Sequence, residues 1–196
     1  MTVNVDLSIS YAGTDPDARA ELCARLERGE PAAVGQVYDE HHEAVRAFAA
    51  RLVGEPAAAE DLVHEVFVSL PRAIHGFRGE SSIRTFLISI AVNHARHFVR
   101  AAARRRAALQ KYSDEPPPSS PSPERDLRRR ELANALSRAL DELPLDQRVA
   151  FVLCDVEERT SSQAARIAGA PEGTMRTRLF HARKKLRALL EKEGFR

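Results

Sequence analysis

The sequence has no tryptophan, only two cysteines and few aromatic residues. Cys23 and Cys154 are too few and too far apart for a disulfide framework or a zinc site, so we expect reduced thiols. No apolar run is long enough to cross a bilayer, and the N-terminus lacks a basic region followed by an apolar core, so we expect a cytoplasmic protein. The 196 residues are 43% hydrophobic and 30% charged, which fits one or two globular domains.

The net charge of +2 conceals a strong asymmetry along the chain. Residues 15–65 hold twelve acidic residues against five arginines, whereas residues 78–111 hold eight basic residues against one acid. Residues 125–196 hold sixteen basic residues against eleven acids. A basic stripe is typical of a nucleic-acid surface, although a single basic run also fits a solvated helix face. Two such runs favour nucleic-acid binding.

Apolar residues recur every three to four positions between residues 16 and 109, which is the period of an amphipathic helix. Pro16, Pro31 and Pro56 suit first helical turns, and Gly29 and Gly54 suit helix ends. No β-strand pattern rises above this helical one. The predicted helices cover residues 16–28, 32–52, 56 to about 74, and about 83–109.

Two of these predicted helices carry further features. Pro71 lies inside the third helix and should kink or shorten it near Val68, because proline lacks an N–H group and clashes with the preceding turn. Ser81 or Ser82 can cap the fourth helix. Only the first half of that fourth helix has a strong apolar stripe. Its second half consists mainly of alanine and arginine, and we expect this half to be exposed.

Five prolines among serines and acids predict an extended linker over residues 111–127. Helix is expected again from about Arg125 to Leu143 and over residues 147–156. A short helix over 161–168, a turn at Gly169 and a longer basic helix from Pro171 to about Leu190 match a helix-turn-helix. We therefore predict an all-α fold with a disordered tail at 1–15 and two small helical domains, at 16–110 and 128–196.

The start of the last predicted helix suits DNA recognition. The N-terminal part of a recognition helix reaches base edges in the major groove. Arg176, Thr177 and His181 fall on the outward side, where arginine can donate two hydrogen bonds to guanine and threonine offers a methyl and a hydroxyl. Arg183, Lys184 and Lys185 suit the backbone phosphates, which dominate affinity but carry no sequence information.

Other chemistry has weaker support. His94 and His97 are three residues apart on one predicted helix, but no acid or thiol accompanies them, so we expect His94 to pack inward and His97 to face solvent or phosphate. The acids Glu60, Asp61 and Glu65 lack a neighbouring histidine or nucleophile, which disfavours general acid–base catalysis. They fit a charged face offered to a basic partner. We expect no catalytic residue, metal or cofactor.

Several ordered segments resemble the extracytoplasmic-function (ECF) sigma factors of the sigma-70 family. The resemblance runs from about residue 18 to 190 and is interrupted only by the linker. Because it involves ordered segments in two domains, it is far more specific than a generic helix-turn-helix. The segments are Ala59–Phe67, Phe77-Arg-Gly, Arg84-Thr-Phe-Leu, Ile90-Ala-Val-Asn, Leu143-Pro, and Gly173-Thr-Met-Arg-Thr-Arg-Leu-Phe-His-Ala-Arg-Lys-Lys-Leu.

The resemblance implies roles for three groups of residues. The first group would face the β′ clamp helices of core RNA polymerase: Asp61, Leu62, Glu65, Val66 and Phe67. The second would capture the non-template strand of the −10 promoter element, with arginines on its phosphates: Phe77, Arg78, Asn93, Arg96, Arg100 and Arg104. The third would read the −35 element: Thr174, Arg176, Thr177, Arg178, His181, Arg183 and Lys184.

The sequence also departs from the family pattern. Phe86 stands where many members have tryptophan, and Ile88, Ser89 and Val92 occupy positions that are often aromatic or basic. Strand melting is therefore expected to depend more on Phe77 and Asn93. Pro71 interrupts the polymerase-facing helix, and Thr160-Ser-Ser-Gln replaces the commoner acidic start of the helix-turn-helix.

The resemblance implies a promoter-specificity subunit. Its partners would be bacterial core RNA polymerase (β′ clamp and β flap), promoter DNA and an anti-sigma factor, with no small-molecule substrate and no membrane insertion. A dimeric regulator that binds duplex DNA alone is a second hypothesis, but it leaves the N-terminal domain without a task. A nucleic-acid-processing enzyme is a third, but it would need metal-binding carboxylates or a nucleophile.

Overall fold

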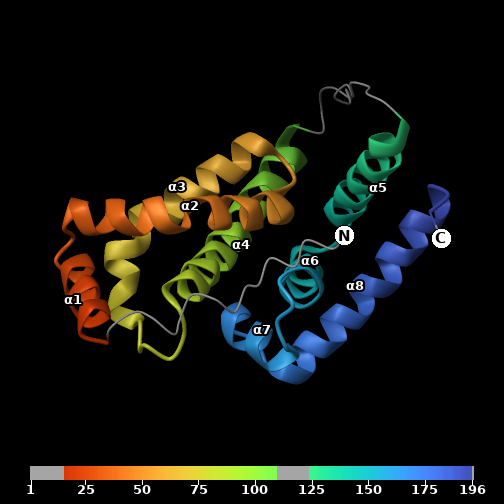
Figure 1. Cartoon of the computed structure of the whole chain (residues 1–196). Coiled ribbons are helices and arrows are strands. Elements are labelled where there is room, and N and C mark those ends of the chain that lie inside the picture. The colour runs from red at the N-terminus through yellow and green to blue at the C-terminus, as the bar shows by residue number, and fades with distance from the viewer. Residues whose placement is uncertain (1–15, 110–123, 196) are drawn as a thin grey trace.

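The structure is a computed structural model that describes residues 16–109 and 124–195. The predicted tail at 1–15 and linker residues 111–123 lie outside this part of the chain. Within the described ranges every regular element is helical and no strand occurs, which confirms the all-α prediction. The helices form an N-terminal and a C-terminal domain that lie against one another (Figure 1).

The N-terminal domain consists of four α-helices and one 3₁₀ turn. Pro31 opens the second helix, and Gly54 ends it in the left-handed conformation at φ 74°. Ser82 caps the fourth helix by accepting a hydrogen bond from the Thr85 N–H at 2.8 Å, as the sequence predicted. The elements are α1 (Pro16–Glu27), α2 (Pro31–Val53), α3 (Pro56–Ala73), η1 (Ile74–Gly76) and α4 (Ile83–Leu109).

Of the kink or shortening expected of the third helix near Val68, the shortening does not occur. α3 continues through Pro71 to Ala73, and the η1 turn follows it directly. The apolar stripe supplies the reason, because Leu70 before the proline and Ile74 beyond it are both buried in the core. Their burial stabilises the last turn, although Pro71 has no N–H to donate to the carbonyl of Phe67 one turn earlier.

The C-terminal domain begins at Glu124, so residues 124–127 of the predicted linker are helical. This difference follows from composition, since no proline occurs between Pro123 and Pro144. The stretch expected as one helix over 147–156 is an α-helix that passes into a wider π-helical turn. The elements are α5 (Glu124–Asp141), α6 (Leu145–Phe151), η2 (Val152–Val156), α7 (Ser161–Ala168) and α8 (Glu172–Lys192).

One apolar core runs through both domains. It includes Phe48, Leu62 and Leu87 of the N-terminal helices together with Leu153 and Met175 of the C-terminal ones. A second, smaller cluster lies between α5 and α8. In Figure 1, α6 and α7 lie between α4 and α8, so the helix-turn-helix is held against the end of the N-terminal domain. This arrangement places the two predicted DNA-binding surfaces close together.

Candidate nucleic-acid interface

The helix-turn-helix is shaped by two local features. The Thr160 hydroxyl accepts from the Gln163 N–H at 3.2 Å, and the Gln163 side chain accepts from the Thr160 N–H at 3.0 Å. This reciprocal capping box fixes the start of α7. Gly169 ends α7 in the left-handed conformation at φ 60°, which turns the chain into α8. The sequence here thus determines the angle at which α8 leaves the turn.

α8 has one buried face and one exposed face. Met175, Leu179, Ala182 and Leu186 lie in the core, one helical turn apart. The predicted base-reading residues Arg176, Thr177 and His181 are exposed on the other side, as are Thr174, Arg183 and Lys184. Arg178 is only half-buried and points toward α6. The helix can therefore pack and present side chains to DNA at the same time.

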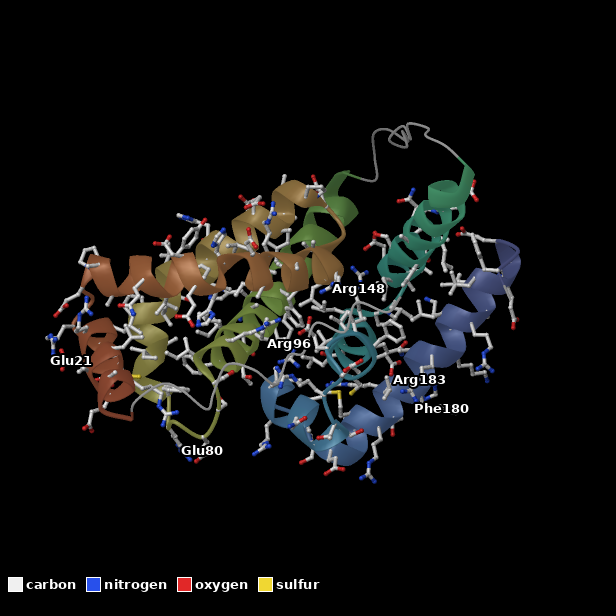
Figure 2. All side chains as sticks on the ribbon, in the orientation of Figure 1. Glu21, Glu80, Arg96, Arg148, Phe180 and Arg183 are labelled. Carbon is white, nitrogen blue, oxygen red and sulfur yellow. The ribbon has the colours of Figure 1, made fainter. Side chains whose placement is uncertain are left out.

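Sequence reasoning missed one residue on this face. Phe180 is 64% exposed and its ring meets the edge of the His181 ring, with 5.5 Å between the ring centroids. It lies along α8 near Arg183 in Figure 2. A large exposed aromatic is unfavourable in water unless a partner covers it. The sequence analysis assigned Phe180 to neither face of the helix, although its position one turn after Arg176 would have placed it on the exposed side.

Several of the basic residues on α8 already have acidic partners. Arg176 pairs with Glu172 one turn earlier. Arg183 donates to Asp155 at 2.8 Å, and this hydrogen bond raises the pKa of Arg183 above its ordinary value. Arg178 donates to Asp146 at 2.6 Å. Phosphate groups would have to replace these carboxylates on binding.

The loop expected to meet the −10 element is anchored by aromatic contact. The Phe77 ring is half-buried and lies 5.1 Å from the Phe86 ring, at 54° to it. Phe86 lies at the start of α4 and supports the loop through this ring contact. Arg78 is exposed beside it. The loop therefore presents the aromatic ring of Phe77, which packs on Phe86, and the exposed guanidinium of Arg78.

A cleft of about 830 Å³ lies between this loop, α4 and α7. Its walls carry more arginine than acid, and they come from both domains. Burial lowers the pKa of His41, one of the lining residues, below its ordinary value. The charged side chains lining the cleft are Arg19, Glu40, Arg78, Glu80, Arg84, Arg159 and Arg166.

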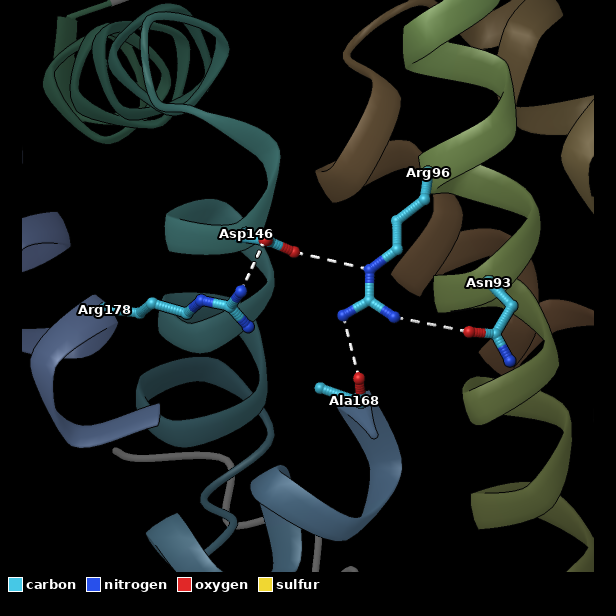
Figure 3. A network of polar contacts seen from close by, with 5 residues as sticks. All are labelled: Asn93, Arg96, Asp146, Ala168 and Arg178. Atoms are coloured by element: carbon cyan, nitrogen blue, oxygen red, sulfur yellow. Dashed lines mark hydrogen bonds and ion pairs between the residues drawn. The ribbon is translucent and has the colours of Figure 1, made fainter. Parts of the chain in front are cut away.

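Asn93 and Arg96 lie further along α4. Asn93 is exposed, whereas Arg96 is half-buried and points toward the C-terminal domain. Arg96 donates to the Asn93 side chain at 3.3 Å, to Asp146 at 3.3 Å and to the Ala168 carbonyl at 2.8 Å (Figure 3). Arg100 and Arg104 belong to the same helix, but their side chains lie outside the described part of the structure.

The polymerase-facing group divides into two sets. Asp61 and Glu65 are exposed on α3, as predicted, and Val68 beside them is 62% exposed. The other three are core residues: Leu62, Val66 and Phe67 are 1%, 0% and 5% exposed. All five residues of the group lie on one short stretch of the predicted helix. The spacing of the apolar residues is the signal in the sequence that separates the buried members from the exposed ones.

The histidines lie as expected, with His94 half-buried beside Ser69 at 2.9 Å and His97 exposed. Within residues 16–109 and 124–195, no three histidine, cysteine or acidic side chains are grouped so that they could hold a metal ion. No helix in that part of the chain is long and apolar enough to span a membrane.

Comparison with known proteins accounts for both domains. Residues 37–105 match the family described as Sigma-70 region 2, and residues 133–186 match Sigma-70, region 4. The chain is 32% identical to the ECF RNA polymerase sigma factor SigE of Mycolicibacterium smegmatis over 181 residues, covering 92% of this chain and 70% of that protein. It is 28% identical to the RNA polymerase sigma-H factor of Pseudomonas aeruginosa over 179 residues, covering 87% and 93%.

A solved structure has the same arrangement of helices. It is the sigma factor RpoE in complex with the anti-sigma factor NepR from Bartonella quintana, with a TM-score of 0.63 and 27% identity over 80% of this chain and 96% of that one. The sequence matches, the shared fold and the exposed basic face of α8 all indicate the same family. The chain belongs to the ECF group of sigma-70 RNA polymerase sigma factors.

Proposed function

We propose that this sigma factor binds core RNA polymerase through α3, reads the −35 element with the first half of α8, and captures the −10 element with the 77–82 loop and α4. It acts without catalysing a reaction of its own, in the cytoplasm where polymerase and promoters are found. The observation that carries this proposal is the division of α8 into a buried apolar stripe and an exposed face of arginine, threonine and histidine.

The chemistry of α8 suits base reading. Arg176 can donate two hydrogen bonds to the major-groove edge of guanine, and Thr177 can meet either base type. Phe180, which we add to the −35 residues, suits contact with the methyl group of thymine. Thr174, Arg178 and His181 complete the face. Arg183 and Lys184 further along the helix suit phosphates and set the position of the helix in the groove.

The −10 element requires an unpaired base. Flipping a base out of the stack costs a few kcal/mol, which contacts with the flipped base and its phosphates must offset. Phe77 offers an aromatic surface for stacking, and Arg78 and Asn93 offer polar groups beside it. Arg96, Arg100 and Arg104 follow α4 and suit the phosphates of the displaced strand.

Polymerase binding is assigned to Asp61 and Glu65, with Val68 as an apolar contact between them and the β′ clamp helices. Leu62, Val66 and Phe67 support this face from the core. The C-terminal domain would meet the β flap. The Bartonella relative was solved with an anti-sigma factor, and we propose an inhibitory partner of this kind here.

Transcription in vitro tests the proposal. The purified chain is mixed with bacterial core RNA polymerase and genomic DNA fragments, and the transcript start sites are mapped. We expect promoter-dependent transcripts whose start sites share upstream sequences near −35 and −10. If the chain bound duplex DNA specifically as a dimer and gave no such transcripts with core enzyme, an autonomous regulator would replace this proposal.

Arg176→Ala tests the −35 assignment. Loss of a bidentate base contact is worth about 1–3 kcal/mol, so we expect roughly a tenfold or greater fall in transcription. The fall should be largest on promoters that carry the preferred base at one −35 position. Arg187→Ala is the control, because Arg187 is also exposed on α8 but lies three turns further from the turn. Equal losses in the two variants would show a general charge effect.

Asp61→Arg tests the polymerase face. Reversing the charge of an exposed residue should raise the Kd for core enzyme without changing promoter preference. Glu21→Arg makes the same change in charge at an exposed position of α1, outside the assigned face, and should leave the Kd unchanged. The assigned face is wrong if both variants bind core enzyme as tightly as the unmodified chain.

A further inference from the structure

The cleft beside the 77–82 loop has the size of a small-molecule site. Its volume is about 830 Å³, and such sites commonly occupy about 300–1,000 Å³. Arg19 of α1 and Arg84 of α4 line it, as do Arg159 and Arg166, which lie just before α7 and within it. The loop after η1 and α7 both lie at the lower edge of the view in Figure 1. The cleft can therefore hold a molecule much larger than a single ion.

The side chains that line the cleft carry an excess of positive charge. Five arginines line it, against the two acids Glu40 and Glu80. Like charges that gather around one hollow raise each other's free energy, and an anion within the hollow offsets that cost. The cleft therefore favours an anionic ligand.

Most of these arginines have no acid to neutralise them. Elsewhere ion pairs are common, for example between Arg25 and Glu30 and between Arg183 and Asp155. Among the arginines whose side chains the structure describes, six have no acidic side chain within 4.0 Å, and four of the six line the cleft. The four in the cleft are Arg19, Arg78, Arg159 and Arg166, and the other two are Arg72 and Arg187. Unpaired guanidinium groups are thus concentrated around one hollow.

The fifth arginine of the cleft, Arg84, is only partly satisfied. It lies 3.5 Å from Glu157, and its Nε is buried and donates to no group in the described part of the chain. A buried donor without an acceptor is costly, and a bound anion or water is one explanation of such a donor in a folded protein. Arg84 therefore has a donor that the described chain leaves unused.

The hydroxyl groups of the cleft are largely committed to the chain. The Ser82 hydroxyl donates to the Thr85 hydroxyl at 2.7 Å, and the Ser89 hydroxyl donates to the Phe86 carbonyl at 2.7 Å. Recognition of a ligand therefore depends mainly on the guanidinium groups. Guanidinium groups bind phosphate oxygens especially well, because two parallel N–H groups match two oxygens of one phosphate.

The arrangement favours several linked phosphates over a single one. One phosphate group is too small to reach arginines that stand on α1, on the loop and on α7 around a hollow of this volume. A diphosphate or triphosphate carries several negative charges, and its phosphates can each meet a different guanidinium. The half-buried Phe77 ring, which packs on Phe86, offers a surface on which an attached nucleobase can stack.

We propose that this cleft binds a small anion with a chain of two or more phosphates, free or attached to a nucleoside, and that Arg19, Arg159 and Arg166 are its main contacts. None of these three arginines is assigned to the promoter or to polymerase, so the site is additional to both. A single DNA strand is the competing occupant. Of the four unpaired arginines, however, only Arg78 belongs to the residues assigned to the promoter.

Isothermal titration calorimetry of the full chain measures the site directly. The probes are inorganic phosphate, pyrophosphate, triphosphate and GTP, in buffer without magnesium. We expect triphosphate to bind at least about tenfold more tightly than phosphate, which is the gain from one further hydrogen bond to a charged group. GTP binding that is tighter than triphosphate binding would place a nucleoside on Phe77, and equal binding would identify the phosphate chain alone as the ligand. Both results support the site.

The double substitution Arg19→Gln, Arg166→Gln removes two of the proposed contacts. The matched control is Arg72→Gln, Arg187→Gln, which removes the same charge from two exposed, unpaired arginines outside the cleft. We expect the first pair to raise the Kd for triphosphate at least about tenfold and the control pair to raise it less than about twofold. Circular dichroism checks that both variants fold like the unmodified chain.

Chemical modification of arginine locates the site without any substitution. Phenylglyoxal reacts with accessible guanidinium groups, and mass spectrometry of peptides gives the rate at each arginine. Triphosphate should slow the modification of Arg159 and Arg166 severalfold and leave the rates at Arg72 and Arg187 unchanged.

Any of four results would overturn the proposal: no saturable binding of triphosphate, equal affinity for phosphate and triphosphate, equal weakening in the two double variants, or equal protection inside and outside the cleft. A single-stranded oligonucleotide that bound more tightly than triphosphate, through Arg19 and Arg166, would assign the cleft to DNA instead. Failure of the promoter-reading function is a separate outcome, because it would appear as absence of promoter-dependent transcripts and would leave these titrations unaffected.

Discussion

The two domains differ in how they obtain a core. The N-terminal domain buries large side chains from three long helices, among them Phe48, Leu52 and Leu70, which are all fully buried. The first helix of the helix-turn-helix, α7, contributes mainly alanines, such as Ala164 and Ala168, and its apolar side joins the core of the N-terminal domain. The separate cluster between α5 and α8 is small. The recognition half of the molecule is thus positioned by a neighbour as well as by its own contacts.

Truncating one buried side chain in each apolar cluster should lower the free energy of unfolding by different amounts, and the larger loss should exceed that of any other change proposed for this chain. Phe48→Ala should lower the free energy of unfolding by about 3–5 kcal/mol, because the cavity opens in the core that both domains share. Leu186→Ala, at the small cluster, should cost about 2 kcal/mol, at the lower end for a buried leucine. Urea denaturation followed by circular dichroism measures both, since the chain has no tryptophan for fluorescence.

Hydrogen exchange of the same variants locates the losses. Phe48→Ala should speed exchange in both domains, whereas Leu186→Ala should speed it mainly in α5 and the end of α8. Equal acceleration across the whole chain in both variants would mean that the two clusters behave as one.

Two glycines allow the cost of a substitution at the contact between the domains to be compared with the cost of one away from it. Gly54 and Gly29 both have positive φ, at 74° and 70°. A Cβ at Gly54 would clash with the Asp141 carboxylate, whereas nothing lies within 4 Å of one at Gly29. Gly29→Ala should cost about 1 kcal/mol for the left-handed backbone, and Gly54→Ala about 2–3 kcal/mol. Denaturation midpoints that shifted equally would show that Asp141 moves aside without cost.

The smallest expected difference between the domains concerns the reactivity of their cysteines, because each domain holds one thiol. Burial raises the pKa of Cys23 and of Cys154, and the charge of Asp155 raises that of Cys154 further. Each thiol should therefore alkylate more slowly with iodoacetamide at neutral pH than in urea, because less thiolate is present. Asp155→Asn should speed alkylation of Cys154 by up to about threefold and leave Cys23 unchanged. Mass spectrometry of tryptic peptides follows both rates.

Local features of the fold could be predicted from the sequence. The apolar period gave the helices, Ser82 was among the expected caps, and Gly54 and Gly169 marked helix ends, because these signals depend on neighbours a few residues away. The exposed positions of Arg176, Thr177 and His181 follow from the same period. The end of α3 lies one residue from the predicted one, and burial of Leu70 and Ile74 keeps the helix from being shortened at Pro71.

Contacts between distant residues could not be predicted in this way. Nothing near Arg148 in the sequence indicates that it is buried and donates to the Leu52 carbonyl, 96 residues earlier in the chain. The pairing of Asp146 with Arg96 and Arg178 likewise depends on how two domains meet. The family resemblance assigned these arginines to DNA and gave no information about their partners in the free chain.

The π-helical turn η2 has a consequence of its own. Such a turn carries one residue more than the α-helical repeat, so the side chains that follow are rotated by about 100° around the axis. Asp155 inside the turn meets Arg183, and Glu157 directly after the turn lies between Arg51 and Arg84. Deleting one residue near the start of this turn would rotate both Asp155 and Glu157 away from their arginines, which no single substitution at either position would do.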